Sequence, residues 1–247
     1  HVAGGLTLQQ VVEAVQEGIE EGVSQALEAG YAIRAAALLD AMRHLDRSLE
    51  VAQLALDNRG RCCVGFDIAG PEAGFPPSLH REAFQLLREA HMPVTIHAGE
   101  ADGAAAVGEA LGLGSARRIG HGVRIHEDID GFGTEEVAYG VVAAHALDLQ
   151  IPLECCPTSN VQTAAAPSLA DHPMHALRDL GFAVTVNTDN RLVSGVSMSS
   201  EFAALARAGW SKEDLFEATL AAAWGAFLPY DERADLAELV IEGFGID

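Results

Sequence analysis

The sequence is poor in cationic side chains and has no long apolar segment. Lysine and arginine number 15 against 36 aspartates and glutamates, and the formal net charge at pH 7 is −21. Nucleic-acid backbones and anionic membrane surfaces repel such a charge, so we expect neither as a partner. No apolar run approaches the roughly 20 residues that a membrane-spanning helix requires. There is also no N-terminal signal pattern, so we expect a soluble, cytoplasmic protein.

Cysteine is also scarce, and the motifs of several other chemistries are missing. The four cysteines form two adjacent pairs, Cys62-Cys63 and Cys155-Cys156. Adjacent cysteines are poor disulfide partners for each other, so we expect buried, reduced thiols. No glycine-rich segment has the spacing of a phosphate loop or a dinucleotide fingerprint. Neither Ser159 nor Cys155 lies in a nucleophile elbow, which argues against covalent acyl transfer.

Short apolar runs alternate with amphipathic segments along the chain. A helix is predicted to begin at Thr7, where Gln10 completes a capping box, and to end at Gly30. Beyond it the apolar runs recur roughly every 25 to 35 residues, the size of a βα unit. Strands are predicted over Ala32–Met42, Val64–Ala69, Pro93–His97, Arg118–His121, Ile151–Cys156 and Ala183–Thr188. Further helices are predicted over 45–58, 79–91, 102–111, 135–149, 172–180, 199–208, 212–227 and 232–242.

This alternation predicts an α/β fold with a buried parallel sheet. On strand count alone, an open flavodoxin-like sheet and a TIM-type (β/α) barrel are both possible. Polar residues favour the barrel, because they follow strand after strand, and only a barrel brings all such strand ends to one mouth. We therefore expect one barrel domain over residues 1–247. The residues at these strand ends are Asp67, Gly70, His97, Glu100, His121, Pro157–Asn160, Asp189 and Asn190.

Four of these residues suit metal-assisted hydrolysis, although each alone also has an ordinary structural explanation. His97 precedes a tight Ala-Gly turn, and Asp189 ends an apolar strand, where a carboxylate is costly unless it is paired or binds a cation. Imidazole and carboxylate together suit zinc or a similar divalent ion. Glu100 could transfer protons beside a metal-activated water. His121 lies between two glycines, which would allow a ligand to approach closely.

Five segments in order resemble the signature of the adenosine deaminase family, in particular its bacterial members. They are 66–72, 97–100, 118–122, 153–160 and 187–190, and residues 42–44 are similar to the end of the family's third strand. The resemblance covers essentially the whole chain. It implies a barrel of the metal-dependent hydrolase kind that uses zinc. Such an enzyme converts adenosine and 2′-deoxyadenosine to inosine or 2′-deoxyinosine and ammonia. Water would add at purine C6, and the small-molecule nucleoside would be the partner.

The resemblance also implies a role for each site residue. His97 and Asp189 resemble zinc ligands, and Asp189 also resembles the group that holds the attacking water. Glu100 resembles the carboxyl that protonates purine N1. His121 resembles the residue that orients or deprotonates the water. Gly70 resembles the glycine whose backbone N–H contacts purine N3.

The sequence departs from the family pattern at two places. Where the family often has a second aspartate that contacts purine N7, this chain has Asn190, whose amide can still hydrogen-bond to N7. The family's first strand carries a His-x-His pair with two further zinc ligands, and this sequence contains no His-x-His. We therefore expect the first two barrel strands to be missing, so that about six of the eight strands remain. We also expect residues 1–5 to be the middle of a loop. Two ligands are fewer than the three of a catalytic zinc site.

Three interpretations stay open. The first is an adenosine deaminase, with adenine or a modified adenosine as a variant substrate. The second is a non-catalytic barrel remnant that binds nucleosides. The third is another metal-dependent hydrolase of the wider amidohydrolase group, whose carboxylated lysine ligand would lie on a middle strand. Lys212 is the only lysine and falls in a late predicted helix, which weakens this third interpretation. Zinc is the expected metal, although cobalt, manganese or iron would suit the same ligands.

Overall fold

Six parallel strands lie side by side in the order in which they occur in the chain. The computed structural model describes residues 4–245. β1 pairs with β2, the strands β3, β4, β7 and β8 pair in succession, and a bridge between Phe66 and Val94 joins β2 to the start of β3. This sequential parallel order is that of a (β/α) barrel. The strands are β1 (Ala37–Met42), β2 (Cys63–Ala69), β3 (Thr95–Ala98), β4 (Arg118–His121), β7 (Leu153–Cys155) and β8 (Val184–Val186).

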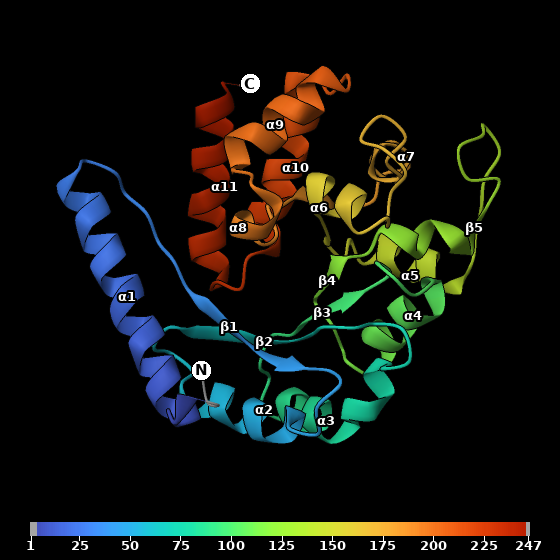
Figure 1. Cartoon of the computed structure of the whole chain (residues 1–247). Helices are drawn as coiled ribbons and strands as arrows, with labels where there is room; N and C mark the ends of the chain where they lie inside the picture. The colour runs from blue at the N-terminus through green and yellow to red at the C-terminus, as the bar shows by residue number, and fades with distance from the viewer. Residues whose placement is uncertain (1–3, 246–247) are drawn as a thin grey trace.

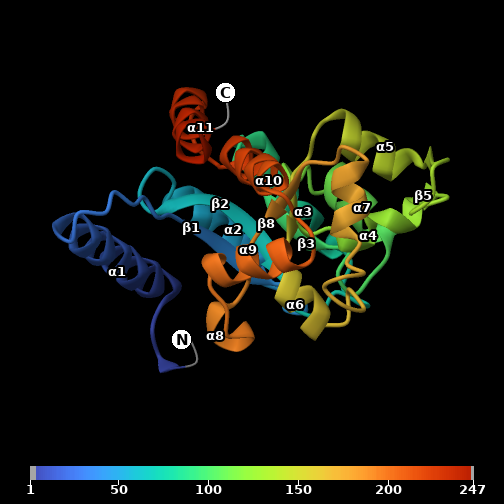
Figure 2. The same ribbon diagram turned by 90° about the horizontal axis from the view of Figure 1, so that it is seen from above.

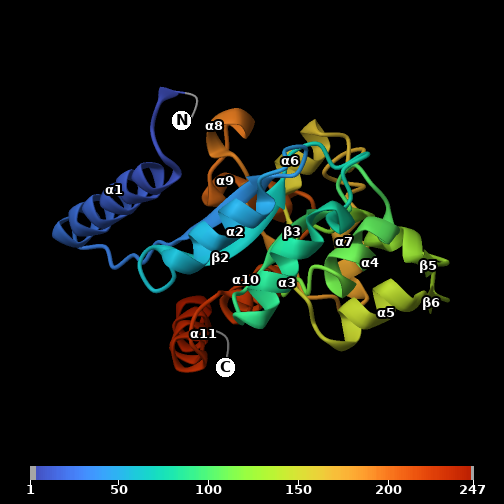
Figure 3. The same cartoon turned by 90° about the horizontal axis from the view of Figure 1, so that it is seen from below.

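The helices between the strands cover the outer side of the sheet. Figure 3 shows α2, α3, α4 and α5 following one another across this side. α2 packs on β1 and β2, and α4 packs on β3. At the other end of the sheet α10 packs on β8 and α11 packs on α10, as Figures 1 and 2 show. The bounds are α2 (Ser48–Asp57), α3 (Arg81–Glu89), α4 (Ala104–Gly112), α5 (Val141–Asp148), α7 (Met174–Asp179), α9 (Met198–Arg207), α10 (Lys212–Gly225) and α11 (Tyr230–Phe244).

The barrel is incomplete. Within residues 4–245, β1 and β8 are the two edge strands of the six-strand order, and they do not pair with each other. A closed barrel of this kind has eight strands. The expected incomplete TIM-type barrel is therefore confirmed. The expected loop over residues 1–5 falls largely outside the described residues, which begin at Gly4.

Apolar residues that point to the helix-covered face of the sheet form much of the core. Phe66, Ile96, Ile119 and Leu153, from four neighbouring strands, are each completely buried. Phe84 of α3 packs edge-on against Phe66, with ring centroids 6.3 Å apart. β2 and β3 are buried at most positions on both faces, which is why they appear in the sequence as short, mostly apolar runs. The predicted strand over 32–42 was too long at its start, because β1 begins at Ala37.

The first helix, α1 (Leu8–Glu28), lies beside β1 at the open end of the sheet (Figure 1). Its predicted capping box is confirmed, because Gln10 N donates to Thr7 Oγ1 and Thr7 N donates to Gln10 Oε1. Val12 is its one buried residue, whereas Val15 and Leu27 are exposed. No helix formed by residues 4–245 combines the length and apolar character needed to cross a membrane.

The predicted helix over 135–149 is wrong in its first half. Residues Ala138–Tyr139 form strand β6, which pairs antiparallel with β5 (Ile129–Asp130), and α5 begins only at Val141. The Asp128 carboxylate sets this start, because Oδ2 accepts hydrogen bonds from Val142 N and Ala143 N. This cap comes from a residue 13 positions before the helix, so the local pattern did not reveal it. The helix predicted over 79–91 overlaps the end of the short helix η2 (Pro77–His80), whereas the sequence gave no sign of η3 (Val123–Asp128), α6 (Pro157–Gln162) and α8 (Arg191–Ser194).

Candidate active site

The predicted site residues lie at the carboxyl ends of β2, β3, β4 and β8. Gly70 follows β2, Glu100 follows β3, and Asp189 and Asn190 follow β8. His97 is the third residue of β3 and His121 is the last of β4. The register places His97 opposite Gly120 and Ala98 opposite His121. The two imidazole rings are consequently neighbours, with centroids 5.1 Å apart.

The glycines on either side of His121 make room for protein atoms. A Cβ at Gly120 would lie 3.0 Å from His97 Cα, and one at Gly122 would lie 2.7 Å from Leu153 Cδ2. Gly122 also has a φ of +67°, which favours glycine. The structure therefore gives these glycines a packing role, where the sequence suggested room for a ligand.

His97 is held by a buried carboxylate from the neighbouring strand. Asp67 Oδ2 lies 2.8 Å from His97 Nδ1, and Asp67 Oδ1 accepts from the backbone N–H of His97. Burial opposes a charge on the ring, but Asp67, followed by Asp40 and Glu154, raises the pKa of His97 to about 9. Asp40 lies opposite Asp67 in the sheet, and burial together with Asp67 raises the pKa of Asp40 to about 6. With Nδ1 occupied, Nε2 is the ring atom of His97 that can bind a ligand.

A second buried carboxylate fixes the loop that carries Glu100. Glu72 accepts hydrogen bonds from four consecutive backbone N–H groups, those of residues 99–102, at 2.6, 3.0, 2.7 and 3.0 Å. Glu72 is 5% exposed, so water does not compete for these bonds. The loop presents Glu100 with Oε2 3.6 Å from His121 Nε2. The sequence motif contained Glu72, but sequence reasoning gave it no role.

Arg43 is fully buried and joins two loops of the site to β3. Its Nε donates to Phe75 O at 2.7 Å, and its Nη1 donates to His97 O at 2.9 Å. The guanidinium therefore fixes the backbone of the strand that carries His97. Arg43 lay in a segment that resembled the family, and here too the sequence suggested no function.

Asp189 and His121 adopt a backbone conformation that is uncommon for residues other than glycine. Their φ angles are +53° and +61°. Such conformations occur preferentially at functional sites, where surrounding contacts maintain them. The carboxylate of Asp189 is held by Ser159 Oγ, which donates to Oδ2 at 2.6 Å, and by the N–H of Asn190, which donates to Oδ1 at 2.7 Å.

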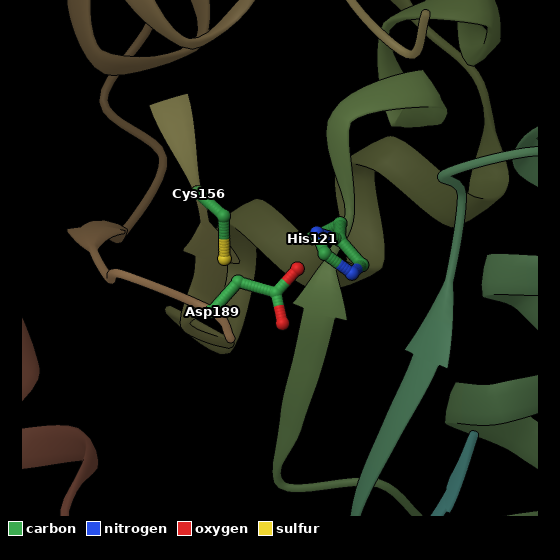
Figure 4. Close-up of side chains that lie close together, drawn as sticks. All are labelled: His121, Cys156 and Asp189. Atoms are coloured by element: carbon green, nitrogen blue, oxygen red, sulfur yellow. The ribbon is translucent and has the colours of Figure 1, made fainter. Parts of the chain in front are cut away.

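The structure places a thiol beside these two residues. Potential ligand atoms of His121, Cys156 and Asp189 all lie within 4.8 Å of one another, a spacing that could hold a metal ion. Figure 4 shows the Asp189 carboxylate between the sulfur of Cys156 and the ring of His121. Burial, followed by the nearby Asp189, raises the pKa of the Cys156 thiol well above its usual range. In the metal-free chain this thiol therefore keeps its proton, whereas a metal ion binds the thiolate.

Behind His121, two buried polar side chains form a hydrogen-bonded network. Asn160 Nδ2 lies 3.0 Å from His121 Nδ1, and Asn160 Oδ1 lies 3.2 Å from His172 Nε2. Burial lowers the pKa of His121, and burial together with His175 lowers the pKa of His172 to about 3. Asn160 lay in a recognised motif without an assigned role. Nothing in the sequence indicated a role for His172, because it lies at the start of a predicted helix.

The two predicted substrate-binding residues lie at the same rim. Gly70 has a φ of +103°, and a Cβ there would lie 3.0 Å from Met42 Cε. Asn190 is the N-cap of α8, where its Oδ1 accepts from Leu192 N and Val193 N. This cap orients the amide and leaves its Nδ2–H groups to reach a ligand.

Comparison with known proteins identifies the family. The sequence profile described as Adenosine deaminase matches residues 1–243. The chain belongs to the adenosine deaminase family. It is 49% identical over 243 residues to Adenosine deaminase 1 of Streptomyces coelicolor and 48% identical over 246 residues to the adenosine deaminase of Mycobacteroides abscessus. These matches cover 98% of this chain but only 61% and 67% of those two proteins.

Solved structures confirm the barrel fold of this adenosine deaminase family member. The adenine deaminase of Arthrobacter aurescens superposes with a TM-score of 0.85 at 27% identity, over 99% of this chain and 71% of that one. A zinc-bound amidohydrolase from Burkholderia ambifaria gives a TM-score of 0.79 at 22% identity, over 98% and 66% of the two chains. Lys212 begins α10 and does not lie on a strand, so it does not supply the lysine ligand of the wider hydrolase group.

Proposed function

We propose that the protein containing this chain deaminates adenosine and 2′-deoxyadenosine by hydrolysis. Water adds at purine C6, the exocyclic amino group leaves as ammonia, and inosine or 2′-deoxyinosine remains. The observation that carries the proposal is the convergence of His97, Glu100, His121 and Asp189 at the carboxyl ends of β3, β4 and β8. The identity to named adenosine deaminases supports this substrate.

His97 and Asp189 are the residues that would hold a zinc ion. Metal-binding histidines usually pair their second ring nitrogen with a carboxylate or carbonyl, as Asp67 pairs with His97 Nδ1. Ser159 orients the Asp189 carboxylate in a similar way. Zinc would lower the pKa of a bound water enough for attack near neutral pH. Because catalytic zinc sites have at least three protein ligands, we propose that residues outside this chain complete the set.

The remaining site residues would bind and protonate the purine. Glu100, on the loop fixed by Glu72, would deliver a proton to N1, which makes C6 more electrophilic. His121 would contact the attacking oxygen from the neighbouring strand. The backbone N–H of Gly70 would bind N3. The Nδ2–H of Asn190 would donate to N7, because its Oδ1 is already engaged in capping α8.

A second candidate substrate is adenine. The Arthrobacter aurescens protein that resembles this fold is described as an adenine deaminase, at 27% identity. The greater identity to adenosine deaminases, 49% and 48%, favours the nucleoside.

The test combines metal content with turnover. We would assay the 247-residue chain and a chimera in which it follows the part of the Streptomyces coelicolor relative that precedes the matched region. The chimera is expected to bind one zinc ion per chain and to form inosine, detected by the change in purine absorbance. His97→Ala and Asp189→Asn should abolish both, whereas His145→Ala, on an exposed part of α5, should not. Deamination of adenine but not adenosine would favour the second candidate. Nucleoside binding without turnover would contradict both.

A further inference from the structure

The hydrogen bonds behind His121 have a direction that two backbone amides determine. Asn160 and His172 are 0% and 2% exposed, and His121 is 3% exposed, so water does not reach the side chains between them. A backbone N–H can only donate, whereas an imidazole nitrogen or a side-chain amide can be assigned in two ways. Each backbone donor in this network therefore fixes the role of the side-chain atom that it contacts.

The first assignment concerns His172. Met174 N donates to His172 Nδ1 at 3.0 Å, so Nδ1 carries a lone pair. A neutral imidazole has one N–H, which must then be on Nε2. Because burial lowers the pKa of His172 to about 3, the ring is neutral. Nε2–H points at Asn160 Oδ1, 3.2 Å away.

The second assignment concerns Asn160. Cys156 N donates to Asn160 Oδ1 at 3.0 Å, and His172 Nε2–H donates to the same atom. Two donors on one atom identify it as the carbonyl oxygen and exclude the flipped amide. The NH₂ group of Asn160 must then face His121 Nδ1, at 3.0 Å.

These assignments fix the proton on His121. The NH₂ group of Asn160 has only donors to offer, so His121 Nδ1 must accept and the ring proton lies on Nε2. We propose that Asn160, held by the Cys156 N–H and by His172, is a positioning residue that keeps His121 in its Nε2–H tautomer. His121 then donates a hydrogen bond into the site from Nε2, on the side where Glu100 lies.

This inference rests on the proposed function for its catalytic meaning. In deamination, the Nε2–H of His121 would donate to the oxygen that attacks C6 and would orient it. Nε2 has no lone pair in this tautomer, so His121 would not take a proton from the water. For the same reason His121 would not coordinate a metal ion through Nε2, although it lies close to Cys156 and Asp189.

The direct test is the tautomer itself, which requires no turnover. The 247-residue chain is labelled with ¹⁵N in histidine, and long-range ¹H–¹⁵N correlation spectra distinguish protonated from unprotonated ring nitrogens. His121→Gln and His172→Gln assign the two signals. We expect protonated Nε2 and unprotonated Nδ1 in both rings. A protonated Nδ1 on His121 overturns the inference.

Asn160→Asp reverses the polarity of the contact with little change in shape. A carboxylate offers His121 Nδ1 only acceptors, so Nδ1 should become protonated in this variant. Asn58→Asp is the matched control, because Asn58 is also a buried amide but bonds to Gln9 and Leu54 O, away from every imidazole of the network. The His121 signals should not change in the control. Unchanged His121 signals in Asn160→Asp would also overturn the inference.

Turnover by the chimera separates the two proposals. Asn160→Asp should lower kcat by about 10²- to 10³-fold, the usual cost of losing one preorganised hydrogen-bond donor, with KM little changed. Asn58→Asp should leave kcat as it is. An Nε2–H tautomer in a protein that does not deaminate adenosine would contradict the proposed function alone. Normal deamination with His121 protonated on Nδ1 would contradict this inference alone.

Discussion

Replacement of Glu72 by glutamine should destabilise the fold and loosen the loop that carries Glu100. The carboxylate of Glu72 accepts four backbone hydrogen bonds from residues 99–102, one at Oε1 and three at Oε2. Glutamine keeps one acceptor oxygen. If that oxygen takes the three-donor position, the new NH₂ group faces Gly99 N–H, and two donors oppose each other inside the protein.

The expected loss follows from these contacts. Leaving the Gly99 N–H without an acceptor costs about 1–3 kcal/mol. The three remaining bonds change from a charged to a neutral acceptor, and charge-assisted bonds are roughly twice as strong. The lower cost of burying a neutral amide offsets part of this loss. We therefore expect Glu72→Gln to lower the free energy of unfolding by about 2–4 kcal/mol.

Two measurements examine this prediction. Urea unfolding gives the free energy, and amide hydrogen exchange reports protection at residues 99–102, which should fall selectively in Glu72→Gln. Glu82→Gln is the control, because Glu82 is exposed on the first turn of α3. If Glu72→Gln changes stability by no more than the roughly 0.5 kcal/mol typical of surface substitutions, and protection at 99–102 is unchanged, the reasoning is refuted.

Three further predictions concern charge and burial. The pKa of His97 in the folded chain is about 9, above the ordinary 6.5. The pairing of His97 with Asp67 therefore stabilises the metal-free fold fully below pH 6.5, and this contribution is lost as the pH rises through 9. Urea unfolding across this range should show a steeper decline in wild type than in Asp67→Asn, and parallel curves would contradict the assignment. All four cysteines are buried, and burial raises the pKa of Cys155 to about 12. A thiol reagent should therefore react slowly with the native chain until urea unfolds it. Rapid labelling of the native chain would refute this prediction. Arg43→Met should lower the free energy of unfolding by about 2–4 kcal/mol, because Phe75 O and His97 O lose a charged donor. Urea unfolding compares this loss of stability with that of Arg47→Met, a substitution at an exposed arginine. Equal losses in the two variants would exclude the proposed role of Arg43 in holding Phe75 O and His97 O.

The sequence predicted the strands because local composition determines them. β2 is buried over most of its length, and the mostly apolar run predicted at 64–69 is visible without any knowledge of the fold. The same holds for α1, whose capping box lies within four residues of sequence. The six strands and their order were therefore accessible, whereas the start of α5 was not. Asp128 sets that start through contacts that only the folded chain creates.

The sequence indicated the candidate site residues but not the residues that hold them in place. His97, Glu100, His121 and Asp189 stand at strand ends, where a titratable residue is conspicuous. Their supports are ordinary residues whose role depends on long-range contacts. Glu72 reaches a loop 27 residues later, and Asn160 reaches a histidine 39 residues earlier. Single-sequence periodicity carries no information about such contacts, so these roles required the structure.

The short helix α6 explains how several parts of the site keep one geometry. Two consecutive residues of α6 hold two strand ends, since Ser159 donates to Asp189 after β8 and Asn160 bonds to His121 at the end of β4. The helix is itself fixed from α9, where the buried Glu201 accepts from Thr158 N and Thr158 Oγ1. A displacement of α6 would therefore move the Asp189 carboxylate and release the His121 tautomer together. Neither Ser159 nor Asn160 is a proposed ligand, yet the orientations of Asp189 and His121 depend on them.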